Sequence, residues 1–140
     1  MNNTVVIDTS VVIGALIGKK GPSREIIRRC LKGQLQPIIS NALYSEYQEV
    51  SNRQNIIDLC PLTQDDIQVL LNAFYSITRW VSIHFLWRPN LIDESDNFVI
   101  ELAIAGNAEM VITNNIKDFN NSEMSFPELQ IVTPETLLKR

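Results

Sequence analysis

Short runs of β-branched residues alternate along this chain with longer segments of helical periodicity, and this alternation restricts the fold more than any other feature. Helical segments between successive strands favour parallel pairing, because a parallel pair needs a long crossover connection. We therefore predict an α/β fold, a three-layer α/β/α sandwich with a central parallel sheet, formed as one domain over residues 1–140. The predicted buried strands are residues 4–7, 37–39, 80–83, 110–113 and 129–132.

Capping residues and glycines set the limits of the predicted helices. Gly33 and Gly106 are expected to end two of them, and Pro134 suits the first position of the last short helix. The predicted N-caps are Ser23, Ser40, Thr63 and Thr133. The predicted helices cover residues 11–17, 23–32, 41–52, 63–77 and 93–106, with a loop at 84–92.

Composition indicates a folded, globular chain. Hydrophobic residues make up 45% and charged residues 20% of the sequence, which is typical of a packed domain. No apolar run is long enough to span a bilayer, and the N-terminus lacks the pattern of a signal peptide, so we expect a cytoplasmic protein without a membrane association. Cys30 and Cys60 form no C-x-x-C pair and are expected to be ordinary apolar positions.

Charge is distributed unevenly along the chain. Six of the twelve basic residues lie between positions 19 and 32, where Arg24 and Arg28 share a helix face, whereas residues 93–135 hold nine acids and one base. A basic patch beside an acidic region suits a phosphate-binding enzyme whose carboxylates hold cations. The same pattern also suits a solvated helix face, and charge alone leaves both interpretations open.

Four acidic residues are candidates for one site at the edge of the sheet. Asp8 directly follows the first strand, and Asp118 follows the strand at 110–113 by a short loop, so both are expected near the carboxyl edge where open parallel sheets bind ligands. Glu46 and Asp96 each share a helix face with apolar residues, which is unusual for a carboxylate. Each also has a structural alternative: a helix cap for Asp8, an ion pair for Glu46, a dipole acid for Asp96 and a loop acid for Asp118.

Converging carboxylates indicate a cation. Two like charges about 4 Å apart repel by roughly 4 kcal/mol at an effective dielectric constant of about 20. Oxygen ligands suit Mg²⁺ or Mn²⁺, which can activate water for attack on a phosphodiester. His84 is the only histidine and has no supporting triad motif, so it is expected to be structural, as are Trp80 and Trp87.

The chain resembles the PIN-domain family. The resemblance rests on Asp8-Thr9-Ser10 after a strand, on Glu46 in SNALYSEYQEV, and on the block RPNLIDESDNFVIELAIAGNAEMVITNNIKDF. It covers essentially the whole chain and is greatest for PIN proteins that are toxin components of toxin–antitoxin pairs, relatives of the VapC toxins. It implies Mg²⁺- or Mn²⁺-dependent cleavage of RNA and neutralisation by a cognate antitoxin protein.

The resemblance also assigns roles to particular residues. It implies that Asp8, Glu46 and Asp96 are catalytic and metal-binding acids, that Asp93 assists, and that Ser10 and Thr113 are the hydroxyl positions. Many PIN domains carry T-x-D, and here Asn115 occupies the third place, so no charge is available there. The chain resembles instead a variant of this motif, T-x-N-x-x-D-F, formed here by Thr113, Asn115, Asp118 and Phe119. In this variant Asp118 supplies the fourth acid.

The leading functional hypothesis is therefore an endoribonuclease, the toxin of a type II toxin–antitoxin pair and a homodimer, with Arg24 and Arg28 as weak candidates for contacts to RNA. A first alternative, favoured by Asn115, is a catalytically degenerate PIN domain that acts as an interaction module. A second is an aspartate-based phosphatase with Asp8 as nucleophile, which is weakened because Asp8-Thr9-Ser10 lacks the second Asp of a D-x-D motif.

Overall fold

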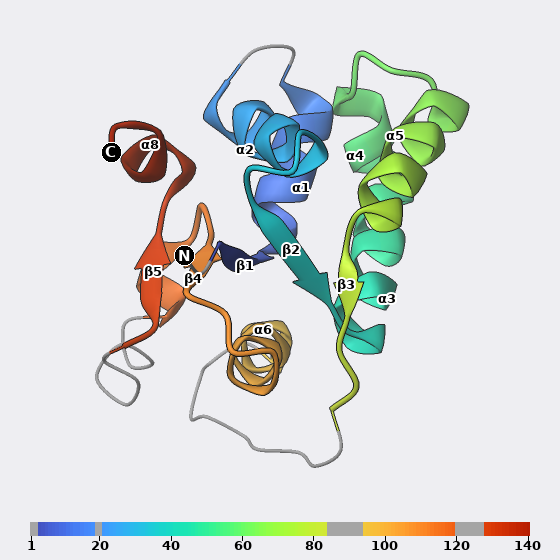
Figure 1. Ribbon diagram of the computed structural model, residues 1–140. Coiled ribbons are helices and arrows are strands. Elements are labelled where there is room, and N and C mark those ends of the chain that lie inside the picture. Colours follow the sequence, from blue (N-terminus) through green and yellow to red (C-terminus); the bar gives the residue numbers. More distant parts are fainter. Residues whose placement is uncertain (1–2, 19–20, 84–93, 120–127) are drawn as a thin grey trace.

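A computed structural model describes residues 3–18, 21–83, 94–119 and 128–140, with no side chains given for 94–97. Five strands alternate with helices along the chain (Figure 1). The strands are β1 (Thr4–Ile7), β2 (Gln36–Ile39), β3 (Arg79–Trp80), β4 (Met110–Ile112) and β5 (Gln130–Val132). The helices are α1 (Thr9–Ile17), α2 (Pro22–Leu31), α3 (Asn41–Ser51), α4 (Gln54–Leu59), α5 (Gln64–Ser76), α6 (Glu94–Ala105), the 3₁₀ helix η1 (Ile116–Phe119) and α8 (Pro134–Leu138).

The sheet has the order β3-β2-β1-β4-β5, and every neighbouring pair is parallel. Val5 of β1 lies beside Pro37 of β2 on one side and beside Met110 of β4 on the other. Strand β1 is therefore central, and Asp8 leaves the sheet at its carboxyl edge between two neighbouring strands. The predicted α/β architecture with a parallel sheet is confirmed.

Strand β1 is apolar because both of its faces are covered. Val5, Val6 and Ile7 have no exposed surface, as expected for a strand between two helical layers. Figure 1 shows α1 and α2 on one side of the strands and α6 on the other. Asp8, the polar residue that directly follows this strand, is buried as well.

Several element boundaries differ from the predictions, most by a single residue, and the larger differences have physical causes. Helix α1 begins at Thr9 rather than at residue 11, and β3 contains only Arg79 and Trp80. Helix α2 begins at Pro22, which suits the first helical position, so Ser23 is not its N-cap. Helix α4 was not predicted; it has six residues, none of them buried, and its N-cap makes no side-chain hydrogen bond. The predicted loop at 84–92 lies outside the described residues.

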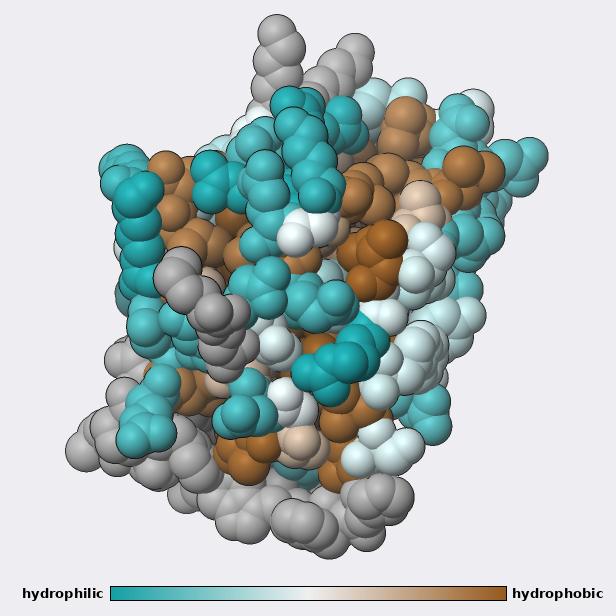
Figure 2. Space-filling model, in the orientation of Figure 1, coloured by the Kyte–Doolittle hydropathy of each residue, from teal (hydrophilic) through white to brown (hydrophobic). Residues whose placement is uncertain are grey.

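One apolar surface lies away from the sheet edge. A cavity of about 460 Å³ between α2 and α5 is lined by Leu31, Leu70 and the exposed Val69. Hydrophobic side chains gather on the visible face where these two helices lie next to each other (Figure 2). Among the described helices, none is both long enough and apolar enough to cross a membrane.

Candidate active site at the end of strand β1

Asp8 is fixed at the carboxyl end of β1 by its backbone and by its side chain. Its backbone N–H donates to the carbonyl oxygen of Ile112 at 2.9 Å, which continues the ladder to β4. Its side-chain Oδ2 accepts hydrogen bonds from Ser10 Oγ at 2.8 Å and from Thr113 Oγ1 at 2.7 Å. Only 5% of Asp8 is exposed, and its side chain makes no capping hydrogen bond to α1. Asp8 therefore occupies the N-cap position of α1, but its side chain is turned to Ser10 and Thr113 rather than capping the helix.

A second layer of hydrogen bonds holds the two hydroxyl groups in place. Thr113 Oγ1 accepts from the backbone N–H of Asn115 at 2.9 Å, and Ser10 Oγ accepts from the backbone N–H of Asn114 at 3.0 Å. Each hydroxyl group thus accepts one backbone N–H and donates its own hydrogen to Asp8 Oδ2, because an ionised carboxylate can only accept. The two hydroxyl positions named from the sequence are brought together on one carboxylate oxygen.

The negative charge of Glu46 lies close enough to act on Asp8. Burial raises the pKa of the Asp8 carboxyl above its ordinary value of 3.8; hydrogen bonds from Thr113 and Ser10 lower it, and Glu46 raises it further. Glu46 is half-buried on α3. No cation is among the groups that shift the pKa of Asp8. Two of the four predicted acids are thus neighbours, and within the described part of the chain no cationic side chain offsets the effect of Glu46 on Asp8.

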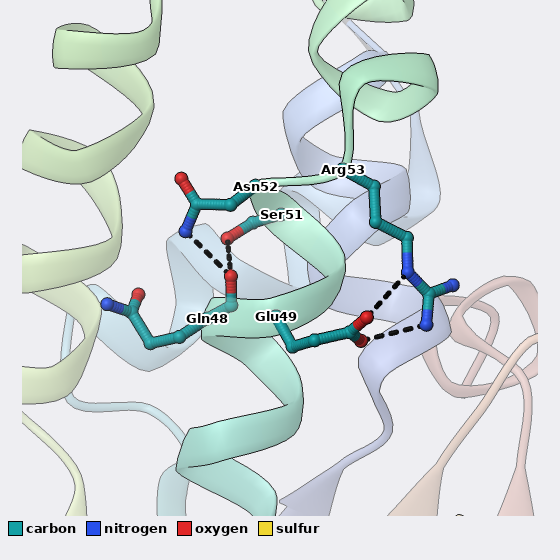
Figure 3. A network of polar contacts seen from close by, with 5 residues as sticks. All are labelled: Gln48, Glu49, Ser51, Asn52 and Arg53. Atoms are coloured by element: carbon teal, nitrogen blue, oxygen red, sulfur yellow. Dashed lines mark hydrogen bonds and ion pairs between the residues drawn. The ribbon is translucent and has the colours of Figure 1, made fainter.

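An exposed ion pair flanks the acidic pair at the end of α3. Arg53 donates through Nε and Nη2 to both carboxylate oxygens of Glu49, at 3.0 and 2.8 Å (Figure 3). These hydrogen bonds raise the pKa of Arg53, followed by the charges of Glu49 and, more weakly, Glu46. Arg53 is therefore held near the acidic pair, but its own carboxylate partner is Glu49.

The other predicted acids are not joined to Asp8 by any contact among the described residues. Asp118 is exposed on η1, and its backbone N–H donates to the carbonyl oxygen of Asn115 at 3.0 Å. Asp96 belongs to α6, but its side chain is outside the described part of the structure, as are Asp93 and His84. Asn115 is exposed, and its hydrogen bond to Thr113 comes from its backbone N–H rather than from its side chain.

The basic helix α2 uses much of its charge locally. Arg24 donates from Nε and Nη2 to the carbonyl oxygen of Ala15, near the C-terminal end of α1, whereas Asp8 precedes the N-terminal end of that helix. Arg28 lies 3.5 Å from Glu25. Neither arginine contacts Asp8 in the described structure. A contribution to RNA binding would therefore require an RNA long enough to reach from Asp8 to α2.

Two residues that support the site were not identified as such from the sequence. The side chain of Asn114 donates to the carbonyl oxygen of Ser10 and to Ser23 Oγ, both at 3.2 Å, which ties α1 and α2 to the end of β4. The hydroxyl group of Tyr47 donates to the carbonyl oxygen of Ile7. Nothing in the local sequence pattern indicates that the hydroxyl group of Tyr47 reaches β1.

The donor set fits a hard divalent ion. Asp8 and Glu46 offer carboxylate oxygens, the ligands that Mg²⁺ and Mn²⁺ prefer, and a cation between them would offset both the burial of Asp8 and the repulsion by Glu46. Within the ranges that the structure describes, no three His, Cys, Asp or Glu side chains form a complete metal-binding group. A third protein ligand would therefore have to come from a side chain outside those ranges, such as Asp96.

Comparison with known proteins gives a consistent result. The sequence profile of a family described as "PIN domain" matches residues 4–117. A solved structure, VapBC2 from Rickettsia felis bound to a DNA fragment from its promoter, contains a chain with a TM-score of 0.60 and 18% sequence identity. The match covers 93% of this chain and 98% of that chain, so the whole fold is shared. No curated protein matches the chain.

Proposed function

Because the chain belongs to the PIN domain family, we propose that it is a metal-dependent endoribonuclease that hydrolyses RNA phosphodiester bonds. The reaction uses Mg²⁺ or Mn²⁺ held by Asp8, Glu46 and Asp96, with Asp118 as the fourth acid and Asp93 assisting. A bound divalent ion would lower the pKa of water and neutralise charge on the phosphate. The proposal needs no nucleophilic side chain.

The observation that carries this proposal is that the buried carboxylate of Asp8 at the end of β1 lies near a second carboxylate, that of Glu46. Burial and the charge of Glu46 both raise the pKa of Asp8, while two hydroxyl hydrogen bonds favour the ionised form. A structural aspartate in a core would normally be paired with a cation or fully hydrogen-bonded. A carboxylate that is buried, oriented by two donors and placed beside a second carboxylate is arranged to bind a cation.

The surrounding residues have distinct roles in this proposal. Ser10 and Thr113 fix the rotamer of Asp8, so that its second oxygen, Oδ1, remains for the ion. Asn115 holds Thr113 through its backbone N–H.

The test is cleavage of a fluorescently labelled single-stranded RNA with Mn²⁺. The wild type should cut the RNA and should stop when the metal is chelated, whereas Asp8→Asn and Glu46→Gln should lose the activity. Glu49→Gln, on the same helix, is a matched control that should keep most of it. Equal cleavage by the wild type and by Asp8→Asn would refute the proposal. A single-stranded DNA of the same sequence tests the preference for RNA.

Asn115 favours a second candidate function, a degenerate PIN domain that serves only as an interaction module. The usual acid is missing at this position, and the Asn115 side chain is exposed with no contact to Asp8 among the described residues. A pure interaction module should bind no Mn²⁺ in a manner that depends on Asp96. Calorimetric titration of the wild type and of Asp96→Asn with Mn²⁺ distinguishes the two functions.

The fold neighbour also suggests partners. That protein belongs to a VapBC complex solved on promoter DNA, and we extend this to the present chain by proposing that it is the toxin of a type II pair. It would then act on RNA in the cytoplasm, form a homodimer and be held inactive by a cognate antitoxin protein. Co-expression with the product of the adjacent reading frame should restore growth of cells that express this chain.

A further inference from the structure

A second cavity opens at the N-terminal end of α3, where residues next to β2, β3 and α6 meet. It has a volume of about 260 Å³ and is lined by Ser40, Ala42, Trp80, Ser82, Phe98 and Glu101, among others. We propose that this cavity is a nucleobase-binding subsite that prefers guanine. The proposal deepens the proposed function, because the base would belong to the RNA whose phosphate lies at Asp8.

The position of the cavity along the sheet supports this assignment. Ser40 follows β2 as Asp8 follows β1, and continuing the register of Val5 and Pro37 places the two residues level on neighbouring strands. Neighbouring strands are about 4.8 Å apart. Ala42 also precedes Glu46 by four residues on α3, about 6 Å along the helix axis. The cavity therefore begins within one nucleotide of the acidic pair.

The walls of the cavity offer an aromatic surface. Trp80 is 50% exposed although it is a large hydrophobic residue, so half of its surface is open to a ligand in addition to its packing role. Tyr44 supports the indole ring from within the protein, with ring centroids 5.4 Å apart. Phe98 of α6 provides a further apolar wall. An exposed, supported indole is a suitable platform for base stacking, which is worth about 1–3 kcal/mol per base in single-strand binding.

Polar groups in the cavity favour a base with N–H donors. Glu101 lines the cavity and is only 4% exposed, so its carboxylate acts in a largely dry environment. Guanine presents N1–H and the N2 amino group side by side, and both can donate to one carboxylate, whereas uracil presents a single N–H between two carbonyl oxygens that a carboxylate repels. The hydroxyl group of Ser40, which accepts from the backbone N–H of Leu43, has a hydrogen available for a carbonyl oxygen of the ligand.

Tryptophan fluorescence provides a test that does not require nuclease activity. The chain has two tryptophans, so Trp87→Phe leaves Trp80 as the sole emitter. This variant is titrated with GMP, AMP, CMP and UMP in the absence of divalent metal. We expect GMP to quench the emission with an affinity about tenfold higher than that of UMP, in the lower range for one bidentate base contact. No response to any nucleotide, or equal responses to GMP and UMP, would overturn the proposal.

Variants in the same Trp87→Phe background identify the groups responsible. Glu101→Gln should remove the preference for GMP over UMP, and Glu135→Gln on α8 is the matched control that should keep it. Ala42→Leu narrows the cavity without altering Glu101, and it should weaken the binding of all four nucleotides. If Glu101→Gln fails to fold, the Ala42→Leu variant still tests whether nucleotides bind in the cavity. A preference that persists in Glu101→Gln, or binding unchanged by Ala42→Leu, would contradict the proposal.

Two further results separate this inference from related possibilities. A short arginine peptide that quenches Trp80 at lower concentration than GMP would assign the cavity to a protein partner and overturn the base-binding assignment. Failure of the wild type to cleave RNA would refute the proposed function alone, because the fluorescence titration measures nucleotide binding directly. If both assays succeed, mapped cleavage sites should be enriched in guanine at one position beside the cut, and Glu101→Gln should reduce that enrichment.

Discussion

Thr113 Oγ1 donates a 2.7 Å hydrogen bond to Asp8 Oδ2, joining residues that are 105 positions apart in the sequence. The contact exists because β1 and β4 are parallel neighbours, so that the residues following each strand meet at the same edge. Thr113 is fully buried and accepts the backbone N–H of Asn115. The hydroxyl group therefore links the end of β4 to the carboxylate on which the proposed chemistry depends.

Thr113→Val should weaken metal binding most strongly at mildly acidic pH. The hydrogen bond from Thr113 lowers the pKa of Asp8 against the effect of burial, so its removal raises that pKa further and protonates the carboxylate at higher pH. We expect Mn²⁺ affinity at pH 6 to fall about tenfold, in line with the loss of one hydrogen bond to a charged group, and to recover as pH rises. Calorimetry across pH measures this effect.

Thr78→Val is the control for this substitution. Thr78 donates to the carbonyl oxygen of Tyr75 at 2.7 Å, away from the site, so this variant also loses one threonine hydrogen bond but should retain wild-type Mn²⁺ affinity at every pH. A similar loss of affinity in both variants would show that Thr113 acts through general stability rather than through Asp8.

Tyr47→Phe should reduce both stability and metal affinity. The hydroxyl group of Tyr47 donates to the carbonyl oxygen of Ile7, the residue before Asp8, and burial followed by the charge of Asp8 raises the pKa of Tyr47 so that it remains a donor. Leaving that buried carbonyl without this donor should lower the free energy of unfolding by about 1–3 kcal/mol. Urea denaturation measures the loss. Tyr75→Phe, which loses a 2.9 Å hydrogen bond to Gln48, should leave Mn²⁺ affinity unchanged.

Asp8→Asn should stabilise the metal-free protein at neutral pH. The pKa of Asp8 is raised in the folded chain, so folding is most favourable when the carboxyl is neutral, and stability is lost as pH rises through the folded pKa. Asparagine stays neutral throughout. With a chelator at pH 7 the variant should melt at higher temperature, by about 2–4 °C for each kcal/mol gained, whereas at pH values below 3.8 the two melting curves should converge.

Saturating Mn²⁺ should reverse this order, because the ion would stabilise only the chain that keeps the Asp8 carboxylate. Differential scanning calorimetry with and without metal tests both halves of the prediction. A metal-free Asp8→Asn variant that melts below the wild type at pH 7 would contradict the inference that the buried carboxylate is a cost to the fold.

Asn114→Ala should lower the stability of the fold without changing metal binding at Asp8. The substitution removes the side-chain hydrogen bonds to Ser10 and Ser23 but leaves the backbone N–H that supports the Ser10 hydroxyl group. We expect a loss of about 1 kcal/mol in the free energy of unfolding with little change in Mn²⁺ affinity. Ser10→Ala should show the opposite pattern, because it removes a donor to Asp8 Oδ2. Equal metal affinities in Ser10→Ala and the wild type would refute that role.

The sequence was sufficient to predict the sheet and the place of Asp8. The run at Thr4–Ile7 is buried on both faces, and such strands have an apolar signature that does not depend on distant residues. Helix α4 carries no such signature, because it has only six residues and none of them is fully buried. The start of α2 was misplaced because Ser23 resembles a cap, whereas its hydroxyl group is buried against Asn114.

The site was only partly predictable for a similar reason. Motif spacing identified Ser10 and Thr113, and the structure brings both to Asp8. The contribution of Tyr47 depends on how α3 packs against β1, and that of Asn114 on how α2 packs against α1; neither arrangement leaves a local pattern in the chain. Trp80 was interpreted as a packing residue because exposure cannot be inferred from residue type, and the edge position of β3 explains its half-exposed ring.

The central claim is that Asp8 and Glu46 share a divalent ion, and calorimetric titration with Mn²⁺ at pH 7.5 tests it most directly. The wild type should show a saturable site that is lost in both Asp8→Asn and Glu46→Gln and kept in Glu49→Gln. Binding of equal affinity and stoichiometry in all four proteins would contradict the claim, since the ion would then be held by neither carboxylate.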